Sequence, residues 1–245
     1  MQTAPEKEPA RANLTSIINL RALLAEKFPQ PPARHGGVFP VELGGKESDS
    51  GEPGNPDGSG KPNAGLELRR GAVTEVAGSP GSGALFLESL LESARAAQAM
   101  MALVDGSGGF EPASAGFGPG QPGPLLWVRC GNVPAALKAA DLLLRDGNLP
   151  LVALDLQMNP AAELRRIPPH TWYRFQRILE PSEAAFVVLT PGPMVGGAAE
   201  RLLLRNRWSL RAMHRRRAEL RRELAAEPVR RRRFGPLTVV ERRIA

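Results

Sequence analysis

The most constraining feature of the sequence is a series of short apolar runs that alternate with helical segments. Most of these runs lack an alternation of apolar and polar residues, which is typical of strands buried on both faces. Helical periodicity fills the intervals, as in the stretches 83–100 and 134–147. Strands that alternate with helices predict an α/β fold with a mainly parallel sheet and helices on both faces. The runs are AVTEVAG (72–78), ALVDG (102–106), LLWVRC (125–130), LPLVALDL (149–156) and AAFVVLT (184–190).

The carboxyl ends of these strands are where a functional site is expected. In open α/β sheets, ligands bind in the crevice beyond the carboxyl ends of the strands. In this chain those ends are Gly78–Gly83, Asp105, Cys130, Asp155 and Thr190.

Composition and periodicity divide the chain into four parts. Residues 1–43 form an N-terminal arm with a helical apolar stripe over 13–28. Residues 44–65 are Gly-, Pro- and Ser-rich with almost no apolar side chains, which predicts a flexible linker. The core domain is expected at 66–210, followed by a basic extension over 211–245, with a helix over 209–226 and strands after it. The first helix is either a tethered arm or a small cap on the core.

Cysteine and histidine usage argues against disulfides and metal sites. The single cysteine, Cys130, cannot form an internal disulfide, which fits the cytoplasm. His35, His170 and His214 lie far apart, so the sequence has no zinc-ligand spacing. No apolar run approaches the roughly 20 residues of a membrane span, and no secretory signal pattern is present. We therefore expect a cytoplasmic protein without membrane contact, metal or other cofactor.

A degenerate phosphate loop lies between the first strand of the core and the helix after it. The phosphate-binding motif has two glycines separated by four residues, then Lys, then Ser or Thr. Gly78 and Gly83 keep this spacing, but Ala84 and Leu85 can neither contact the β and γ phosphates nor ligate magnesium. Backbone N–H groups here could still attract an anion; the alternative is an ordinary tight strand-to-helix turn. The segment consists of Gly78, Ser79, Pro80, Gly81, Ser82, Gly83, Ala84 and Leu85.

The order of the motifs resembles bacterial RecA recombinases and their relatives. VTEVAGSPGSG, LVDGSGGFEP, LLWVRC and PLVALDL occur in the family's order over roughly residues 66–210. The resemblance matches Asp105, Glu111 and Pro112 to a family run that holds the catalytic Glu, but Ser107 stands at the position of that Glu. It also matches Asp155 to the Walker B acid. The resemblance therefore implies a RecA-like fold without the residues needed for ATP hydrolysis.

Within this group the chain is most similar to the ImuA proteins, which are associated with SOS-induced translesion synthesis. The likeness lies in the N-terminal helix, the degraded phosphate loop and the tail over 201–224. It implies a non-catalytic accessory protein whose partners are an ImuB-like polymerase subunit, a DnaE-type polymerase, RecA and DNA. Two alternatives remain: an ATP-dependent recombinase, which Ala84 and Ser107 argue against, and a SulA-like division inhibitor, which does not require the basic tail.

An aromatic cluster follows Pro168 and Pro169. Its rings, Trp172, Tyr173 and Phe175, could stack on bases. Helical spacing of this kind is more typical of core packing, which we therefore favour.

Arginine is concentrated in the last fifth of the chain. A basic block of this kind is typical of contact with a polyanion. A high-GC genome that favours Arg over Lys predicts the same composition. The candidate contacts to DNA or to a partner are Arg215, Arg216, Arg217, Arg230, Arg231, Arg232 and Arg233.

Overall fold

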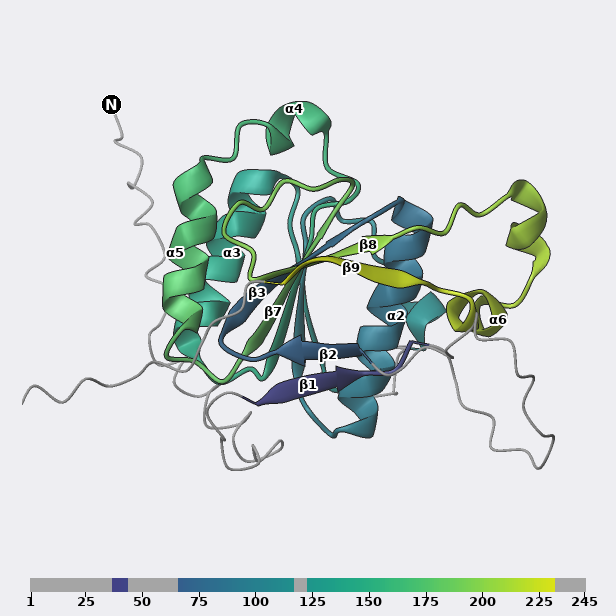
Figure 1. Cartoon of the computed structure of the whole chain (residues 1–245), viewed down its shortest axis with the longest axis horizontal. Coiled ribbons are helices and arrows are strands. Elements are labelled where there is room, and N and C mark those ends of the chain that lie inside the picture. The colour runs from purple at the N-terminus through teal and green to yellow at the C-terminus, as the bar shows by residue number, and fades with distance from the viewer. Residues whose placement is uncertain (1–36, 44–65, 117–122, 232–245) are drawn as a thin grey trace, which may run out of the picture. The chain divides into compact units, whose positions relative to one another are not determined.

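The computed structural model describes residues 37–43, 66–116 and 123–231. A central sheet runs through this region (Figure 1). It has seven strands in the order β5-β4-β6-β7-β3-β8-β9. All neighbouring strands are parallel except β8 and β9, which are antiparallel. The predicted α/β class with a mainly parallel sheet is confirmed. The strands are β3 (Ala72–Ala77), β4 (Met101–Asp105), β5 (Leu125–Arg129), β6 (Leu151–Asp155), β7 (Ala185–Thr190), β8 (Glu200–Leu204) and β9 (Ala226–Arg231).

The register brings the expected carboxyl ends to one edge of the sheet. Asp105 pairs with Asp155 on one side and with Arg129 on the other. Ala77, which precedes the degenerate phosphate loop, pairs with Thr190. The sheet interior is mainly apolar, and β4 and β7 are buried along their whole length.

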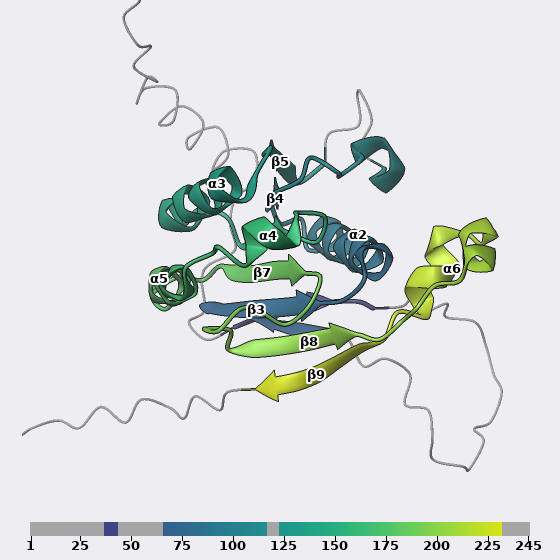
Figure 2. The same cartoon turned by 90° about the horizontal axis from the view of Figure 1, so that it is seen from above.

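Helices cover both faces of the sheet, as predicted. Figure 2 shows α3 and α5 on one face and α2 with α6 on the other. Sequence signals set the ends of α3, because the Asn132 side chain caps the N–H of Ala135 and Gly147 ends the helix with a φ of 72°. The helices are α2 (Pro80–Ala96), α3 (Val133–Asp146), α4 (Ala161–Leu164), α5 (Pro169–Leu179) and α6 (Arg217–Arg222), with 3-10 turns η1 (Pro112–Ala115) and η2 (Leu210–His214).

The predicted start of the core at residue 66 is too late. Strand β1 (Val38–Val41) pairs antiparallel with β2 (Leu66–Arg69), and the side chains of Phe39 and Val41 are buried in the core cluster. The strand is only four residues long and contains Pro40, so its apolar alternation is too short to stand out in the sequence. The stripe over 13–28 and the whole linker 44–65 lie outside the described residues.

The predicted boundary at residue 210 and the continuous helix over 209–226 are also wrong. The segment instead forms η2, α6 and the start of β9, and Arg215 and Arg216 between the two helices have extended backbone. Leu220 and Leu224 are buried in the core cluster, whereas Leu210 is 83% exposed. The apolar residues of the segment thus serve separate short elements, and the tail completes the domain. Strand β9 pairs antiparallel with β8 at the edge of the sheet.

Candidate functional site

The segment Gly78–Leu85 has the geometry of a tight strand-to-helix turn. Helix α2 begins at Pro80, before the second glycine of the spacing. The Ser79 side chain caps the helix by accepting from the N–H of Ser82 at 3.4 Å, and the N–H of Gly83 donates to the carbonyl of Ser79 at 2.9 Å. Pro80 has no N–H group to donate. The N–H of Gly78 donates to the carbonyl of Thr190. The N–H groups of Gly78, Ser82 and Gly83 are therefore bonded within the fold, whereas a phosphate-binding nest would direct such donors at an anion.

The two positions after the second glycine lie inside the helix. Leu85, which stands where the motif has a hydroxyl residue, is 4% exposed and packs in the core cluster. The Ser82 hydroxyl, one turn earlier, donates to the carbonyl of Asn206 at 3.0 Å. The side chains at this end of α2 are thus committed to the fold.

Gln157 fills the space between this turn and strand β6. Its amide nitrogen Nε2 donates to the carbonyl oxygens of Gly78 and Ser79 at 3.3 and 3.5 Å, and the residue is only 6% exposed. A Cβ atom placed on Gly83 would lie 1.7 Å from Gln157 Oε1. Gly83 therefore gives room to a buried amide. Sequence analysis missed Gln157, although it follows the Walker B-like acid by two residues.

Asp155 is the last residue of strand β6 and lies two residues before Gln157. Its Oδ1 accepts from the N–H of Gln157 at 3.0 Å. Burial raises the pKa of Asp155 to about 6; the hydrogen bond from Gln157 opposes this shift, and the neighbouring Asp105 adds to it. Among the described residues, no group of His, Cys, Asp and Glu side chains is arranged to hold a metal ion.

Asp105 holds the loop that carries the RecA-like run LVDGSGGFEP. Its carboxylate is 1% exposed and accepts from the N–H groups of Gly108, Gly109 and Phe110 at 2.8, 3.1 and 2.9 Å. Gly108 has a φ of 74°, which favours glycine. Glu111, further along, caps the turn η1. Asp105 and Glu111 therefore stabilise the local backbone. Ser107 lies exposed in the loop between them.

Cys130, at the next strand end, is a buried residue. Burial and the nearby Asp105 carboxylate raise the pKa of its thiol, which keeps the thiol protonated and unreactive near neutral pH.

The aromatic cluster is divided between the core and the surface. Trp172 and Phe175 are buried, and the ring of Phe175 meets that of Phe186 edge-on with centroids 5.4 Å apart. Core packing is thus confirmed for these two residues. Tyr173 lies on the opposite side of α5 and is 52% exposed.

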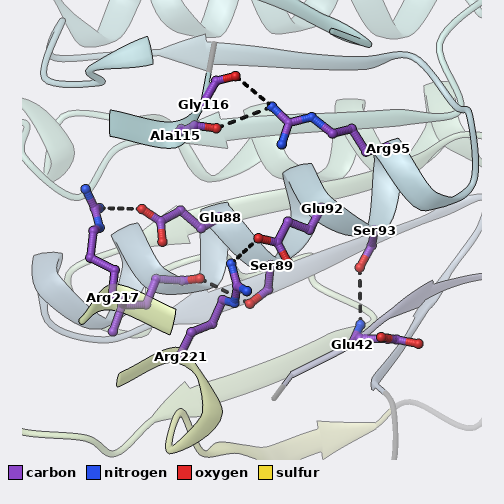
Figure 3. Close-up of polar contacts among 11 residues, drawn as sticks. Glu42, Glu88, Ser89, Glu92, Ser93, Arg95, Ala115, Gly116, Arg217 and Arg221 are labelled. Carbon is purple, nitrogen blue, oxygen red and sulfur yellow. Dashed lines mark hydrogen bonds and ion pairs between the residues drawn. The ribbon is translucent and has the colours of Figure 1, made fainter. Parts of the chain in front are cut away.

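The arginines of the tail have different environments. Figure 3 shows that Arg217 and Arg221 of α6 point toward Glu88 and Glu92 of α2. The pair between Arg217 and Glu88 measures 2.6 Å, and burial of Glu88 raises the pKa of its carboxyl while Arg217 lowers it. These pairs, with the buried leucines of the segment, hold α6 against α2.

Of the other candidate arginines, the structure describes the side chains of Arg215 and Arg216. Arg215 binds Glu223 at 2.5 Å and Glu219 at 3.5 Å within its own segment. Arg216 is exposed at the start of α6. The remaining candidates belong to β9 or to the chain after it: Arg230 and Arg231 are the last residues of the strand, and Arg232 and Arg233 lie outside the described residues.

Helix α2 is the element on which distant segments converge. The Ser93 hydroxyl accepts from the N–H of Glu42 at the end of β1, at 3.2 Å. Arg95 donates to the carbonyl oxygens of Ala115 and Gly116 beside η1, at 3.4 and 3.1 Å (Figure 3). The helix that would follow a phosphate loop is therefore enclosed by β1, η1 and α6. No helix in the described part of the chain is long and apolar enough to cross a membrane.

Comparison with known proteins identifies no family. No protein-family model matches the chain. No curated protein matches it either. Among solved structures, the chain is similar to the crystal structure of the RadB recombinase, with a TM-score of 0.43 and 16% identity over 56% of this chain and 76% of that one. No activity follows from a likeness at this level.

Proposed function

We propose that this chain is a non-catalytic RecA-like accessory protein that acts in the cytoplasm by binding other macromolecules. The observation that carries the proposal is the closed turn at Gly78–Gly83 with Gln157 packed against it. Phosphoryl transfer depends on a phosphate cradle, a lysine and a bound magnesium ion. In this chain three N–H groups of the loop are bonded within the fold, and Ala84 stands in place of the lysine.

The finer role that we propose is in SOS-response DNA repair and error-prone translesion synthesis. It rests on the resemblance to ImuA proteins, which implies an ImuB-like polymerase subunit, a DnaE-type polymerase and RecA as partners. DNA is a further partner, through arginines of the basic tail and other exposed basic surfaces. The enclosed α2 and the charged exterior support a protein that presents surfaces to partners and performs no chemistry at the sheet edge.

The absence of catalysis is tested with the purified full-length chain. ATP turnover is measured with and without single-stranded DNA, in parallel for the parent and for Asp155→Ala. We expect no turnover above background for either protein. The double substitution Ala84→Lys and Leu85→Thr should not create turnover, because it supplies no general base. ATP turnover in the parent that disappears in Asp155→Ala would overturn the proposal.

The binding role is tested by co-purification. The tagged chain is used to capture a purified ImuB-like subunit, a DnaE-type polymerase and RecA, each added separately. Retention of at least one of them at physiological salt is the expected result. Failure to retain any of the three would remove the translesion role, even if the chain is inactive as an ATPase.

A further inference from the structure

The outward face of α5 carries a stripe of basic and aromatic side chains. His170, Tyr173, Arg174 and Arg177 recur at helical spacing and are all exposed. The opposite side of the same helix is buried in the core, so the helix cannot turn the stripe inward. Tyr173 is the only tyrosine in the chain. Its exposure is unexplained by packing, because the core contacts of α5 are made by its neighbours.

Tyr173 lies between two surface hollows. The first, of about 570 Å³, is lined by Tyr173 together with His170, Arg174 and Arg177. The second, of about 540 Å³, is lined by Tyr173 with Arg165 and the prolines of the loop after β7. Each hollow therefore combines the tyrosine ring with at least one arginine, and each falls in the usual size range for a bound small group.

The arginines on the two sides of Tyr173 carry charge that the fold does not use. Arg165 and Arg177 are exposed, and neither forms a salt bridge with another described residue. Arg174 is partly neutralised by Asp141 of α3 at 3.1 Å, and Glu180 is the acidic residue that lines the first hollow. Arg215, Arg217 and Arg221 of the tail, in contrast, are paired with glutamates. The α5 face thus keeps two uncompensated guanidinium groups that flank an exposed ring.

We propose that this α5 face, defined by Arg165, His170, Tyr173, Arg174 and Arg177, binds single-stranded nucleic acid. A base stacks on the ring of Tyr173, and Arg165 and Arg177 contact phosphates on either side of it. Surfaces that bind single strands combine aromatic platforms with a positively charged path for the backbone. An acidic peptide would be attracted by the arginines but would have no use for an aromatic ring between them. The inference gives the DNA contact of the proposed function a location and rests on that function.

The unique tyrosine allows a direct test of stacking. The full chain is labelled with 3-fluorotyrosine, which produces one ¹⁹F resonance, from Tyr173. We expect this resonance to shift on addition of a twenty-nucleotide oligothymidine and to stay in place on addition of inorganic polyphosphate, which has charge but no bases. If anisotropy shows that the oligonucleotide binds but the ¹⁹F resonance does not shift, the assignment of Tyr173 to the site is wrong. A shift produced equally by polyphosphate would show a site for polyanions and would overturn stacking.

Affinity measurements test the arginines and the ring separately. Anisotropy titrations of the labelled oligothymidine are made between 50 and 200 mM salt. Each phosphate contact to a single strand adds about −0.7 to the slope of log K against log salt, so Arg165→Gln with Arg177→Gln should flatten the slope by about 1.4. By the same slope, the ratio of the parent's binding constant to that of the variant should fall about sevenfold as salt rises from 50 to 200 mM. Tyr173→Ala should weaken binding at least about fivefold, and Tyr173→Phe should restore it.

A matched control removes the same charge elsewhere. Arg69→Gln with Arg129→Gln takes two exposed arginines from β2 and from the end of β5, and should leave both affinity and slope unchanged. The tail variant, with Arg230 to Arg233 replaced by Gln, separates this inference from the proposed function. If the tail variant loses binding while the α5 variants keep it, the α5 site is wrong and a DNA contact remains in the tail. If the parent does not bind at low salt, the α5 site and the DNA contact both fail, and the polymerase and RecA partners are judged by co-purification alone.

Discussion

The raised pKa of Asp155 predicts that its carboxylate destabilises the folded chain near neutral pH. The folded-state pKa of about 6 exceeds the ordinary value of 3.8 because the carboxyl is partly buried, and thus poorly solvated, at the end of β6. A difference of about 2.2 pKa units corresponds to about 3 kcal/mol at 1.36 kcal/mol per unit. Because the folded state binds the proton more tightly, the stabilisation is complete below pH 3.8 and is lost as pH rises through 6. Asp155→Asn resembles the protonated form at every pH.

Asp155→Asn should therefore be more stable than the parent by only about 0.5 kcal/mol at pH 4 and by up to about 3 kcal/mol at pH 8. For a chain of this size, about 2–4 °C per kcal/mol gives an increase in Tm of roughly 6–12 °C at pH 8. The side-chain oxygen of Asn can still accept from the N–H of Gln157, so this hydrogen bond is kept. Thermal unfolding by circular dichroism at pH 4, 6 and 8 measures the effect. Glu67→Gln, at an exposed position, is the control and should show no change.

The result that would refute this reasoning is a variant less stable than the parent at pH 8, or one shifted equally at pH 4 and pH 8. The first would mean that the ionised Asp155 carboxylate makes a favourable contact in the folded chain. The second would mean that the substitution changes packing and that burial of charge is not the cause.

Three further substitutions test the packing around α2 and its N-terminal turn. Leu224→Ala should lower the free energy of unfolding by about 2–5 kcal/mol in urea titrations, since the side chain is fully buried. Leu210→Ala, at an exposed site, is the control and should change the free energy of unfolding little. Equal effects of the two substitutions would show that the tail is not part of the core. Arg217→Gln should destabilise the chain more than Glu88→Gln in the same assay, because only Arg217→Gln leaves the Glu88 carboxylate without the cation that it contacts. The reverse order of the two effects would contradict a stabilising ion pair between Arg217 and Glu88. Gly83→Ala should cost about 1–3 kcal/mol despite the better helix propensity of alanine, because the new methyl group displaces the buried amide beside it; a stabilised variant would show that this space is open.

The order of strands and helices was predictable from sequence because it is encoded locally. Runs such as 102–106 and 184–190 are apolar over the length of one strand, and α3 has a cap at Asn132 and a stop at Gly147. The spacing in the aromatic cluster likewise placed Trp172 and Phe175 in the core. The absence of a lysine after Gly83 was visible without any structure, and so was the possibility of a simple tight turn.

The sequence did not predict the edges of the domain. Strand β1 has four residues, and its burial depends on pairing with β2 across a long intervening segment. The tail was read as one helix, because the spacing of its leucines and the density of arginine gave no sign of a break at Arg215 and Arg216. The packing of segments remote in sequence decides which edges of a sheet are covered. Short elements contain too few residues to give a recognisable periodic pattern.

The roles of individual charged and polar residues were decided only by tertiary structure. Arg221 and Glu92 are 129 positions apart in the sequence, and Gln157 reaches Gly78 across 79 positions. Periodicity fixes whether a side chain faces inward or outward on its own element, but it does not say which residue of another element will stand opposite. For this reason the sequence alone determined that the chain is an α/β protein with a degenerate phosphate loop. Only the folded arrangement decided that the loop is a closed turn and that Arg217 and Arg221 hold α6 against α2. It also decided that Tyr173 is exposed between Arg165 and Arg177, which form no ion pair within the described residues.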